Sequence, residues 1–274
     1  MTYPMGRMIL EGNPLLRRHV IAPQHGVLAA GRFLLDLRRE QYDVVLDYMA
    51  TPRSAVFARI IPAKQRIAFE TSRSFLFTKT IPRSKTDLYI VLEKFKLLEQ
   101  IGFNPVDNRM TLPLSDSDYV KARNFLASNP NLSSSKMRVI LSPTHRRAER
   151  RWPLERWAQL ASWLEKSKNA KVIWIWGPGE ENVVDSVMSL APGVGVKSPK
   201  TSFRELAALI SESHLFIGNS NGPSHVAVAV DIPSIQLHGP TRAASWCPLT
   251  ERHRAVQGTD IFGVTVADVI RQID

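Results

Sequence analysis

Two segments of the sequence carry the side chains best suited to bind a phosphorylated ligand. In the first, residues 142–153, Thr144 and His145 precede a run of arginines that includes Arg146 and Arg150. Guanidinium groups offer forked donors, and the start of a following helix adds partial positive charge, so this combination suits a phosphate. The sequence leaves a second interpretation open, in which the segment is only a solvated basic loop.

The second segment, residues 218–225, is predicted to end a strand and begin a helix. Its candidate binding residues are Ser220, Asn221, Gly222, Pro223 and His225. Ser220 or Asn221 can cap a helix that Pro223 starts, which leaves backbone N–H groups and the helix dipole free to bind an anion. A lone His in a helix is usually structural, but His225 would lie beside this anion site and so becomes a candidate ligand.

Two further segments are weaker candidates. Glu180 and Glu181 follow a tight Gly-Pro-Gly turn, where a carboxylate can accept hydrogen bonds from a ribose diol or simply stabilise the first turn of a helix. Gly239, Pro240 and Thr241 follow another apolar run and offer small residues and a hydroxyl. Taken alone, this last segment is an ordinary turn.

Several known nucleotide and metal motifs are missing from the sequence. Neither G-x-x-x-x-G-K-[ST] nor G-x-G-x-x-G occurs, and no Cys/His cluster has the spacing of a structural zinc site. We therefore expect a phosphate site of another kind, with no metal and no cofactor.

The elements that position these segments form a regular series after residue 136. Strands are predicted at 138–141, 172–176, 194–197, 215–218 and 234–238, and helices near 154–166, 181–190, 202–212 and 223–230. Near-continuous apolar strands are typical of parallel sheets covered on both faces, so we expect a doubly wound α/β sheet. The residues that follow such strands meet at one edge, which would bring the four segments together.

The front half of the chain is less regular but also α/β in pattern. A buried strand is predicted at 44–46, and helices around 28–40, 53–61 and 86–101. The polar stretch 115–135 has the composition of a connector that contains one short helix. We therefore expect two domains, 1–134 and 135–274.

The composition favours an anionic partner. The chain has 274 residues, with 36 Lys and Arg against 25 Asp and Glu, for a net charge of +11. Nucleic acid, anionic lipid and phosphorylated small molecules all remain candidates on charge alone. Because the sequence carries no helix-turn-helix or base-stacking signature, we expect no nucleic acid. The single Cys247 and the lack of a long apolar run indicate a cytoplasmic protein.

The order of these motifs resembles glycosyltransferase family 9, the ADP-heptose:lipopolysaccharide heptosyltransferases. The resemblance covers nearly the whole chain and rests on residues 42–47, 53–54, 66–69, 143–153, 177–181, 202–207, 218–225 and 239–241. It implies a GT-B architecture, in which two Rossmann-like domains face a cleft. The nucleotide-sugar would bind to domain 135–274 and the acceptor to domain 1–134.

The resemblance also implies roles for individual residues. Arg150 would neutralise the diphosphate leaving group, and Glu180 or Glu181 would bind the ribose. The diphosphate would be surrounded by Thr144, Ser220, Asn221, Gly222, His225 and Thr241, and the wider substrate set adds His145, Arg146, Pro223, Gly239, Pro240 and Arg53. The implied reaction is an inverting, metal-independent transfer in which a general base takes the proton of the acceptor hydroxyl.

The chain departs from the family pattern at its start. Family members usually open with a strand and a Gly-Asp loop whose Asp resembles the general base, and we expect this unit to be absent, which leaves the N-terminal domain incomplete. Asp47 and Asp43 are the nearest acidic substitutes, and we take Asp47 as the catalytic candidate. Ser220 stands where the family has an acidic residue.

Two interpretations therefore stay open. In the first, the protein moves a heptose from ADP-heptose to a phosphorylated, lipid-linked saccharide of the lipopolysaccharide core, at an anionic membrane surface on the cytoplasmic side. In the second, it is a catalytically silent nucleotide-sugar-binding homologue, or a truncated reading frame that lacks the base.

Overall fold

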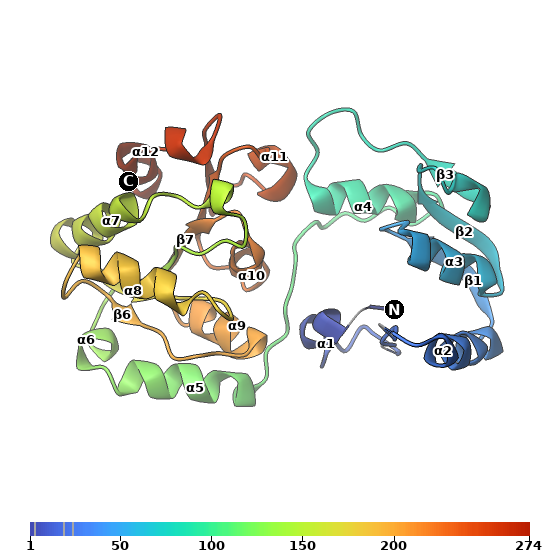
Figure 1. Cartoon of the computed structure of the whole chain (residues 1–274), viewed down its shortest axis with the longest axis horizontal. Coiled ribbons are helices and arrows are strands. Elements are labelled where there is room, and N and C mark those ends of the chain that lie inside the picture. Colours follow the sequence, from blue (N-terminus) through green and yellow to red (C-terminus); the bar gives the residue numbers. More distant parts are fainter. Residues whose placement is uncertain (3, 19, 24) are drawn as a thin grey trace. The chain divides into compact units, whose positions relative to one another are not determined.

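The computed structural model describes residues 1–2, 4–18, 20–23 and 25–274. The chain divides into two compact units, Met1–Asn108 and Arg109–Asp274. Both units are α/β with a parallel sheet, as Figure 1 shows. The predicted α/β class is confirmed, and each unit is described by itself.

The larger unit, Arg109–Asp274, is built on a six-stranded sheet with the order β6-β5-β4-β7-β8-β9. Its strands are β4 (Arg138–Ser142), β5 (Lys171–Trp174), β6 (Val196–Lys197), β7 (Leu215–Asn219), β8 (Ser234–His238) and β9 (His253–Gln257). All neighbours are parallel. The strand order reverses between β4 and β7, and such a switch point is where open α/β sheets bind ligands.

Helices cover both faces of this sheet. They are α5 (Asp116–Ala127), α6 (Pro130–Ser133), α7 (Leu154–Ser167), α8 (Glu181–Leu190), α9 (Phe203–Ser211), α10 (Gly222–Ala229), α11 (Ala243–Trp246) and α12 (Val266–Ile273), with 3-10 turns at Ala148–Arg150 and Ile261–Gly263. One face packs around Trp152 and Trp157, which are fully buried with their rings 4.9 Å apart. The other packs around Ile140 and Phe216. The predicted doubly wound sheet is confirmed.

The observed strands differ from the predicted ones at strand ends and at the sheet edge. β5 ends at Trp174 and not at 176, and beyond it the Trp176 indole donates to the carbonyl of Ser198 at 3.1 Å. β9 was not predicted at all. It is an edge strand in which only His253 and Val256 are buried while Arg254 and Gln257 are exposed, so it forms no apolar run.

The predicted boundary between residues 134 and 135 differs from the structural division after Asn108. The segment 109–134 packs on the larger unit because Arg204 of α9 pairs with Asp118 of α5, with Nη2 to Oδ2 at 2.8 Å and Nε to Oδ1 at 3.0 Å. The guanidinium lowers the pKa of Asp118 to about 2. The serines that gave this stretch its connector-like composition lie on exposed turns and at helix ends.

The smaller unit, Met1–Asn108, has a three-stranded parallel sheet in the order β1-β2-β3, with β1 at one edge. The strands are β1 (Tyr42–Asp47), β2 (Ala63–Phe69) and β3 (Lys79–Ile81), and the helices α1 (Pro4–Leu10), α2 (Val27–Arg39), α3 (Pro52–Ile60) and α4 (Ile90–Glu99), with a 3-10 turn at Ser74–Leu76. Its core centres on Ile67, Phe69 and Leu97. The strand predicted at 44–46 and three predicted helices are present, whereas α1, β2 and β3 were not predicted.

Candidate functional site

Side-chain hydrogen bonds of two asparagines, one fully buried and one partly buried, join the loops at the switch point of the larger unit. Asn219, the last residue of β7, is fully buried, and its Oδ1 accepts from the backbone N–H of Trp152 at 3.1 Å. Its Nδ2 donates to the carbonyl of Pro143 at 2.9 Å. The Nδ2 of Asn221 donates to the carbonyl of Thr144 at 2.8 Å. The predicted segments 142–153 and 218–225 therefore lie against each other.

The start of α10 agrees with the prediction in part. Asn221, one of the two predicted alternatives, takes the N-cap position, but the helix begins at Gly222, one residue before the predicted Pro223. The hydroxyl of Ser224 accepts from the Asn221 N–H at 3.2 Å and donates to the Asn221 carbonyl at 2.7 Å. No atom lies within 4 Å of the position that a Cβ on Gly222 would take. This helix end is therefore open to a ligand, and its dipole favours an anion.

The arginines of the basic cluster differ in their surroundings. Arg146 and Arg147 are exposed, whereas Arg150 and Arg151 are partly buried. The Nε of Arg150 is buried and has no hydrogen-bond partner among the described residues. Because buried donors are nearly always satisfied, Arg150 is the guanidinium best prepared to bind an added oxygen ligand.

The structure distinguishes between the two adjacent glutamates. The carboxylate of Glu181 pairs with Lys197 at 2.9 Å on the exposed side of α8. The side chain of Glu180 is 19% exposed, and its Oε1 lies 4.0 Å from Nη2 of Arg151. Glu180 also folds back over its own turn, since a Cβ on Gly177 would lie 2.8 Å from its Oε2. Glu180 thus lies near the loop that follows β4, whereas Glu181 lies on the exposed side of α8.

The histidines near the site are neutral at pH 7. Burial lowers the pKa values of His145 and His225 below the ordinary value of 6.5. The His225 ring contacts Trp246 at 6.0 Å between centroids. His238, which the sequence did not single out, is fully buried, and burial lowers its pKa to about 4. The positive potential of the site therefore comes from guanidinium groups and the helix end.

The turn at Gly239 and Pro240 is held by the strand that the sequence missed. Gln257 of β9 donates from Nε2 to the carbonyl of Gly239 at 2.6 Å. A Cβ on Gly239 would meet the backbone N of Ile261 at 2.5 Å, so no larger residue fits there. This anchoring leaves Pro240 exposed and Thr241 partly buried, with the Thr241 hydroxyl 3.5 Å from Nδ1 of His238.

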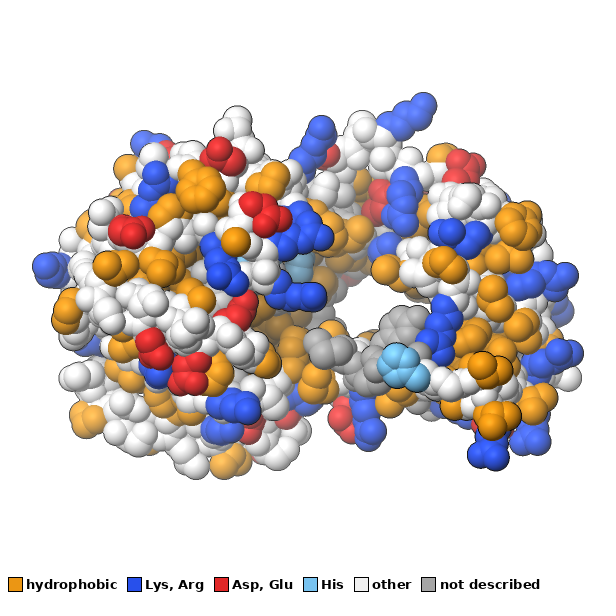
Figure 2. All heavy atoms as spheres, viewed as in Figure 1, with side chains coloured by type: hydrophobic (Ala, Val, Ile, Leu, Met, Phe, Trp, Pro, Cys, Tyr) orange, Lys and Arg blue, Asp and Glu red, His pale blue; other side chains and the backbone are white. Residues whose placement is uncertain are grey.

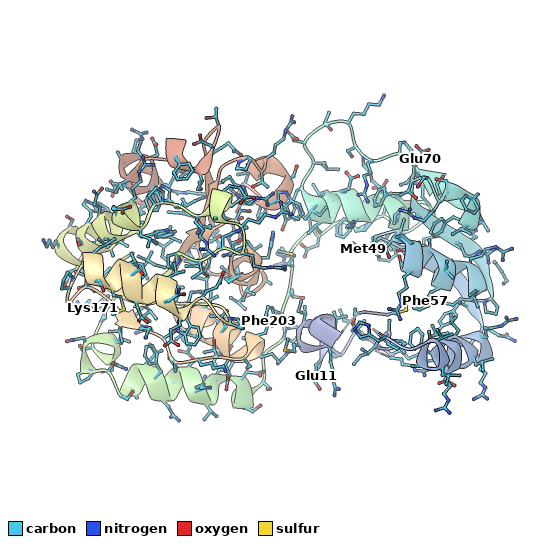
Figure 3. All side chains as sticks on the ribbon, in the orientation of Figure 1. Glu11, Met49, Phe57, Glu70, Lys171 and Phe203 are labelled. Carbon is cyan, nitrogen blue, oxygen red and sulfur yellow. The ribbon has the colours of Figure 1, made fainter. Side chains whose placement is uncertain are left out.

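The two candidate site residues of the smaller unit are Asp47 and Arg53. Their hydrogen bonds are made with other residues of that unit. Asp47 is 8% exposed, and its Oδ1 accepts from the N–H groups of Met49 at 3.1 Å and Ala50 at 2.9 Å. Its Oδ2 is buried and has no partner among the described residues. Arg53 donates to the carbonyl of Pro23 and lies over the ring of Phe57, a residue labelled in Figure 3. The alternative acid Asp43 is exposed and pairs with Lys64 at 2.8 Å.

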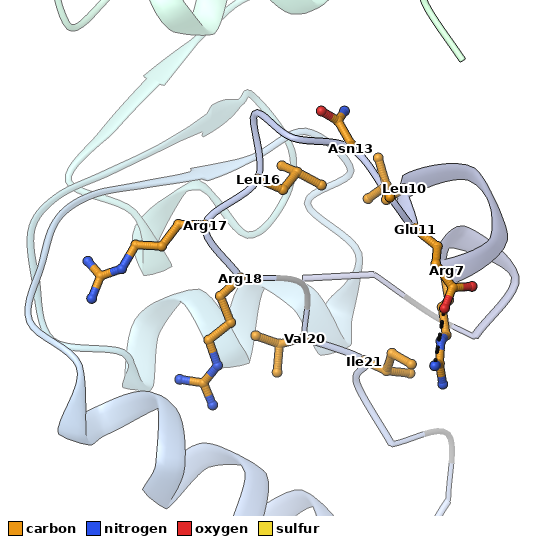
Figure 4. A pocket seen from close by; sticks show the side chains of 10 residues that line it. Arg7, Leu10, Glu11, Asn13, Leu16, Arg17, Arg18, Val20 and Ile21 are labelled. Carbon is orange, nitrogen blue, oxygen red and sulfur yellow. Dashed lines mark hydrogen bonds and ion pairs between the residues drawn. The ribbon is translucent and has the colours of Figure 1, made fainter. Parts of the chain in front are cut away.

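The smaller unit also contains two cavities. One of about 970 Å³ runs beside β1 and is lined largely by apolar residues such as Val44, Leu46 and Phe57, with Asp47 at its wall. The other, of about 550 Å³, is lined by residues between Arg7 and Ile21 (Figure 4). In that view Arg7 bonds Glu11, while Arg17 and Arg18 extend from another part of the wall.

The described residues contain neither a metal-binding cluster nor a membrane-spanning helix. Within residues 1–2, 4–18, 20–23 and 25–274, no group of three or more His, Cys, Asp or Glu side chains is placed to hold a metal ion. In the same part of the chain, no helix combines the length and apolar character needed to cross a bilayer.

A protein-family model matches most of the chain. The model of glycosyltransferase family 9 (heptosyltransferase) matches residues 30–261. The chain is 27% identical over 220 residues to the lipopolysaccharide core heptosyltransferase OpsX of Haemophilus influenzae. The matched segment covers 77% of this chain and 61% of that protein. It is 28% identical over 226 residues to lipopolysaccharide heptosyltransferase 3 of Escherichia coli K12, covering 78% and 64%. The chain thus spans less than two thirds of the length of these relatives.

Solved structures share the fold. A glycosyl transferase family 9 protein from Veillonella parvula superposes with a TM-score of 0.86 at 18% identity, over 99% of this chain and 86% of that one. The ADP-heptose lps heptosyltransferase II of E. coli gives a TM-score of 0.76 at 17% identity, with the same coverages. E. coli heptosyltransferase WaaC with ADP gives 0.66 at 21% identity, over 89% and 75%.

Proposed function

This chain belongs to glycosyltransferase family 9, and we propose that it binds a nucleotide-diphosphate sugar, with ADP-heptose as the first candidate, and transfers the sugar to a saccharide of the lipopolysaccharide core. The observation that carries the proposal is the switch point, where the open end of α10 lies beside the loop of Arg150, whose buried Nε has no hydrogen-bond partner among the described residues. The names of the relatives support the choice of heptose and acceptor.

The side chains of the loops in the larger unit support the following contacts for the donor. The diphosphate binds at the start of α10, beside Thr144, Asn221 and Gly222, with His225 as a neutral donor. The ribose hydroxyls bind the carboxylate of Glu180, a role supported by its Oε1 lying 4.0 Å from Arg151 of the neighbouring loop. Ser220, Thr241 and the exposed Arg146 complete the surroundings of the phosphates.

The proposed reaction is an inverting transfer without a metal. The acceptor hydroxyl attacks the anomeric carbon, the bond to the diphosphate breaks, and Arg150 stabilises the negative charge that develops on the departing oxygen. The acceptor binds to the smaller unit, where Asp47 lines the large cavity and is the candidate base, with an Oδ2 that has no hydrogen-bond partner among the described residues.

One observation favours a second candidate function, which is nucleotide-sugar binding without turnover. The other carboxylate oxygen of Asp47 already accepts two backbone N–H groups and so serves as a turn cap. A carboxylate held by these two bonds is fixed in its turn and is less able to reorient toward an acceptor hydroxyl.

Calorimetry on the full chain with ADP and ADP-heptose tests the binding step, and we expect saturable binding of both. A turnover assay with ADP-heptose and a truncated lipopolysaccharide acceptor, run with and without EDTA, separates the two functions. Turnover unaffected by EDTA is the expected result for the transferase. Binding without turnover supports the second candidate, and no binding of either nucleotide at millimolar concentration refutes both.

We also propose that the smaller unit contacts an anionic membrane surface on the cytoplasmic side, where a lipid-linked, phosphorylated acceptor is held. On α2, Val27 and Leu28 are more than four-fifths exposed and Leu35 is 60% exposed, next to exposed Arg32 and Arg38. Figure 2 shows basic and apolar side chains intermixed over this unit. Exposed apolar residues beside arginines suit the interface of an anionic bilayer.

Co-sedimentation with lipid vesicles tests this contact. We expect the chain to sediment with phosphatidylglycerol vesicles and not with phosphatidylcholine vesicles, and Leu35→Glu to reduce the bound fraction. Leu190→Glu is the matched control, because Leu190 is similarly exposed but lies on α8. Equal loss in both variants, or no binding to either lipid, would rule out α2 as the contact.

A further inference from the structure

We propose that Arg151 is a positioning residue that holds Glu180 in the orientation in which it binds the ribose of the nucleotide, and so sets the preference for a ribonucleotide over a deoxyribonucleotide. The proposal rests on the proposed function, because it takes Glu180 as the ribose ligand. It concerns a residue that neither the sequence motifs nor the proposed chemistry uses.

The first observation is that Arg151 is held at its own position. Its Nε donates to the carbonyl of His145 at 2.5 Å, which closes the loop after β4 on itself. The next residue, Trp152, is fully buried, and its backbone N–H is bonded to Asn219. The backbone next to Arg151 is therefore held by a hydrogen bond, and one N–H of its guanidinium already donates to a carbonyl.

The second observation is that the same guanidinium reaches the neighbouring loop. Nη2 of Arg151 lies 4.0 Å from Oε1 of Glu180, in the loop after β5. Because β4 and β5 are paired neighbours, Arg151 links two loops that border the switch point. The side chain of Glu180 is 19% exposed against 48% for Glu181, whereas Arg151 at 35% is about as exposed as Lys197 at 32%, so the carboxylate is the better shielded member of this pair.

The chemistry of the pair follows from this geometry. A carboxylate that accepts two ribose hydroxyls must keep one orientation, and the positive charge of the guanidinium, 4.0 Å from Oε1, attracts the carboxylate toward that orientation. Without Arg151, Glu180 is free to turn into solvent at the exposed Gly-Pro-Gly turn. The contacts of Arg151 are with Glu180 and His145, so its removal should weaken ribose recognition and leave phosphate binding largely intact.

The test compares the affinities of the full chain for ADP and 2′-deoxy-ADP by calorimetry. In the wild type we expect a preference for ADP of about tenfold, the scale of one hydrogen bond to a charged group. Arg151→Met should reduce this ratio toward one, with a much smaller change in the affinity for 2′-deoxy-ADP. Arg147→Met is the matched control, since Arg147 is an exposed arginine of the same loop.

Two further variants separate positioning from other roles. Glu180→Gln should lower the ratio as Arg151→Met does, and the double variant should lower it no further, because the two residues act as one unit. Arg151→Lys should restore part of the preference, since it keeps the charge but not the fork. Thermal unfolding of each variant checks that the fold is kept.

The outcomes also distinguish this inference from the proposed function. If ADP binds to the wild type and Glu180→Gln lowers the ratio but Arg151→Met does not, the inference is wrong and the function stands. Equal losses of both nucleotides in Arg151→Met would show that Arg151 contacts the phosphates, which also overturns it. Failure of the wild type to bind ADP would refute the function itself.

Discussion

Replacement of Arg150 by alanine is expected to weaken nucleoside diphosphate binding by roughly 1.5–3 kcal/mol, or about ten- to 150-fold in Kd. The reason is that the Arg150 guanidinium is partly buried, with an Nε that has no hydrogen-bond partner among the described residues. A phosphate oxygen would satisfy this donor in a place that salt screens poorly. Calorimetric titration of the full-length variant with ADP at fixed ionic strength measures the effect.

Arg146→Ala is the control for this measurement. Arg146 belongs to the same basic cluster but is exposed, so its loss should cost clearly less affinity. If the wild type shows turnover, Arg150→Ala should also lower kcat by about 10²–10³, as expected for a group that acts on developing charge. Small and equal effects of both variants on ADP binding would mean that the cluster is a solvated face, and that the role given to Arg150 is wrong.

Asn219→Leu is expected to lower the free energy of unfolding by about 3–5 kcal/mol and to abolish nucleotide binding. The leucine keeps the volume but leaves the Trp152 N–H and the carbonyl of Pro143 without the partners that the amide supplies. Both groups lie in a buried region where water does not replace the lost bonds. Urea denaturation of the wild type and the variant gives the difference.

Asn221→Ala provides the comparison for Asn219. It removes one amide bond, to the carbonyl of Thr144, from a residue that is only partly buried. We therefore expect a loss of stability of about 1 kcal/mol, with a larger effect on ADP binding than on folding. If Asn219→Leu cost no more stability than Asn221→Ala, the buried amide would not be what joins the two loops.

Much of the larger unit could be predicted because its central strands are buried on both faces. β8 matches its predicted bounds, since Ser234–His238 is buried at every position. Edge positions carry no such signal, and in β9 only His253 and Val256 are buried. The place of α5 depends on Arg204 and Asp118, which are 86 residues apart in sequence, so the boundary between the units could not be found from local composition.

The candidate site was predictable at the level of loops and less so at the level of atoms. Strand ends and helix caps located the segments around Thr144 and Asn221, because those signals are local. The choice between Glu180 and Glu181 was not predictable, since it depends on Arg151 and Lys197 from other elements. Asn219 was also missed, although an amide that ends an otherwise apolar run was a usable signal.

The joined loops also determine when the site forms as the protein folds. The bonds of Asn219 to Trp152 and Pro143 span 67 and 76 residues, so they close only after β4 and β7 have paired across that length of chain. No short piece of the larger unit contains both loops. If a nucleotide binds at these loops, its binding free energy opposes unfolding of the whole sheet and not of one loop. Above Kd, the stability of the larger unit then rises with the logarithm of the nucleotide concentration.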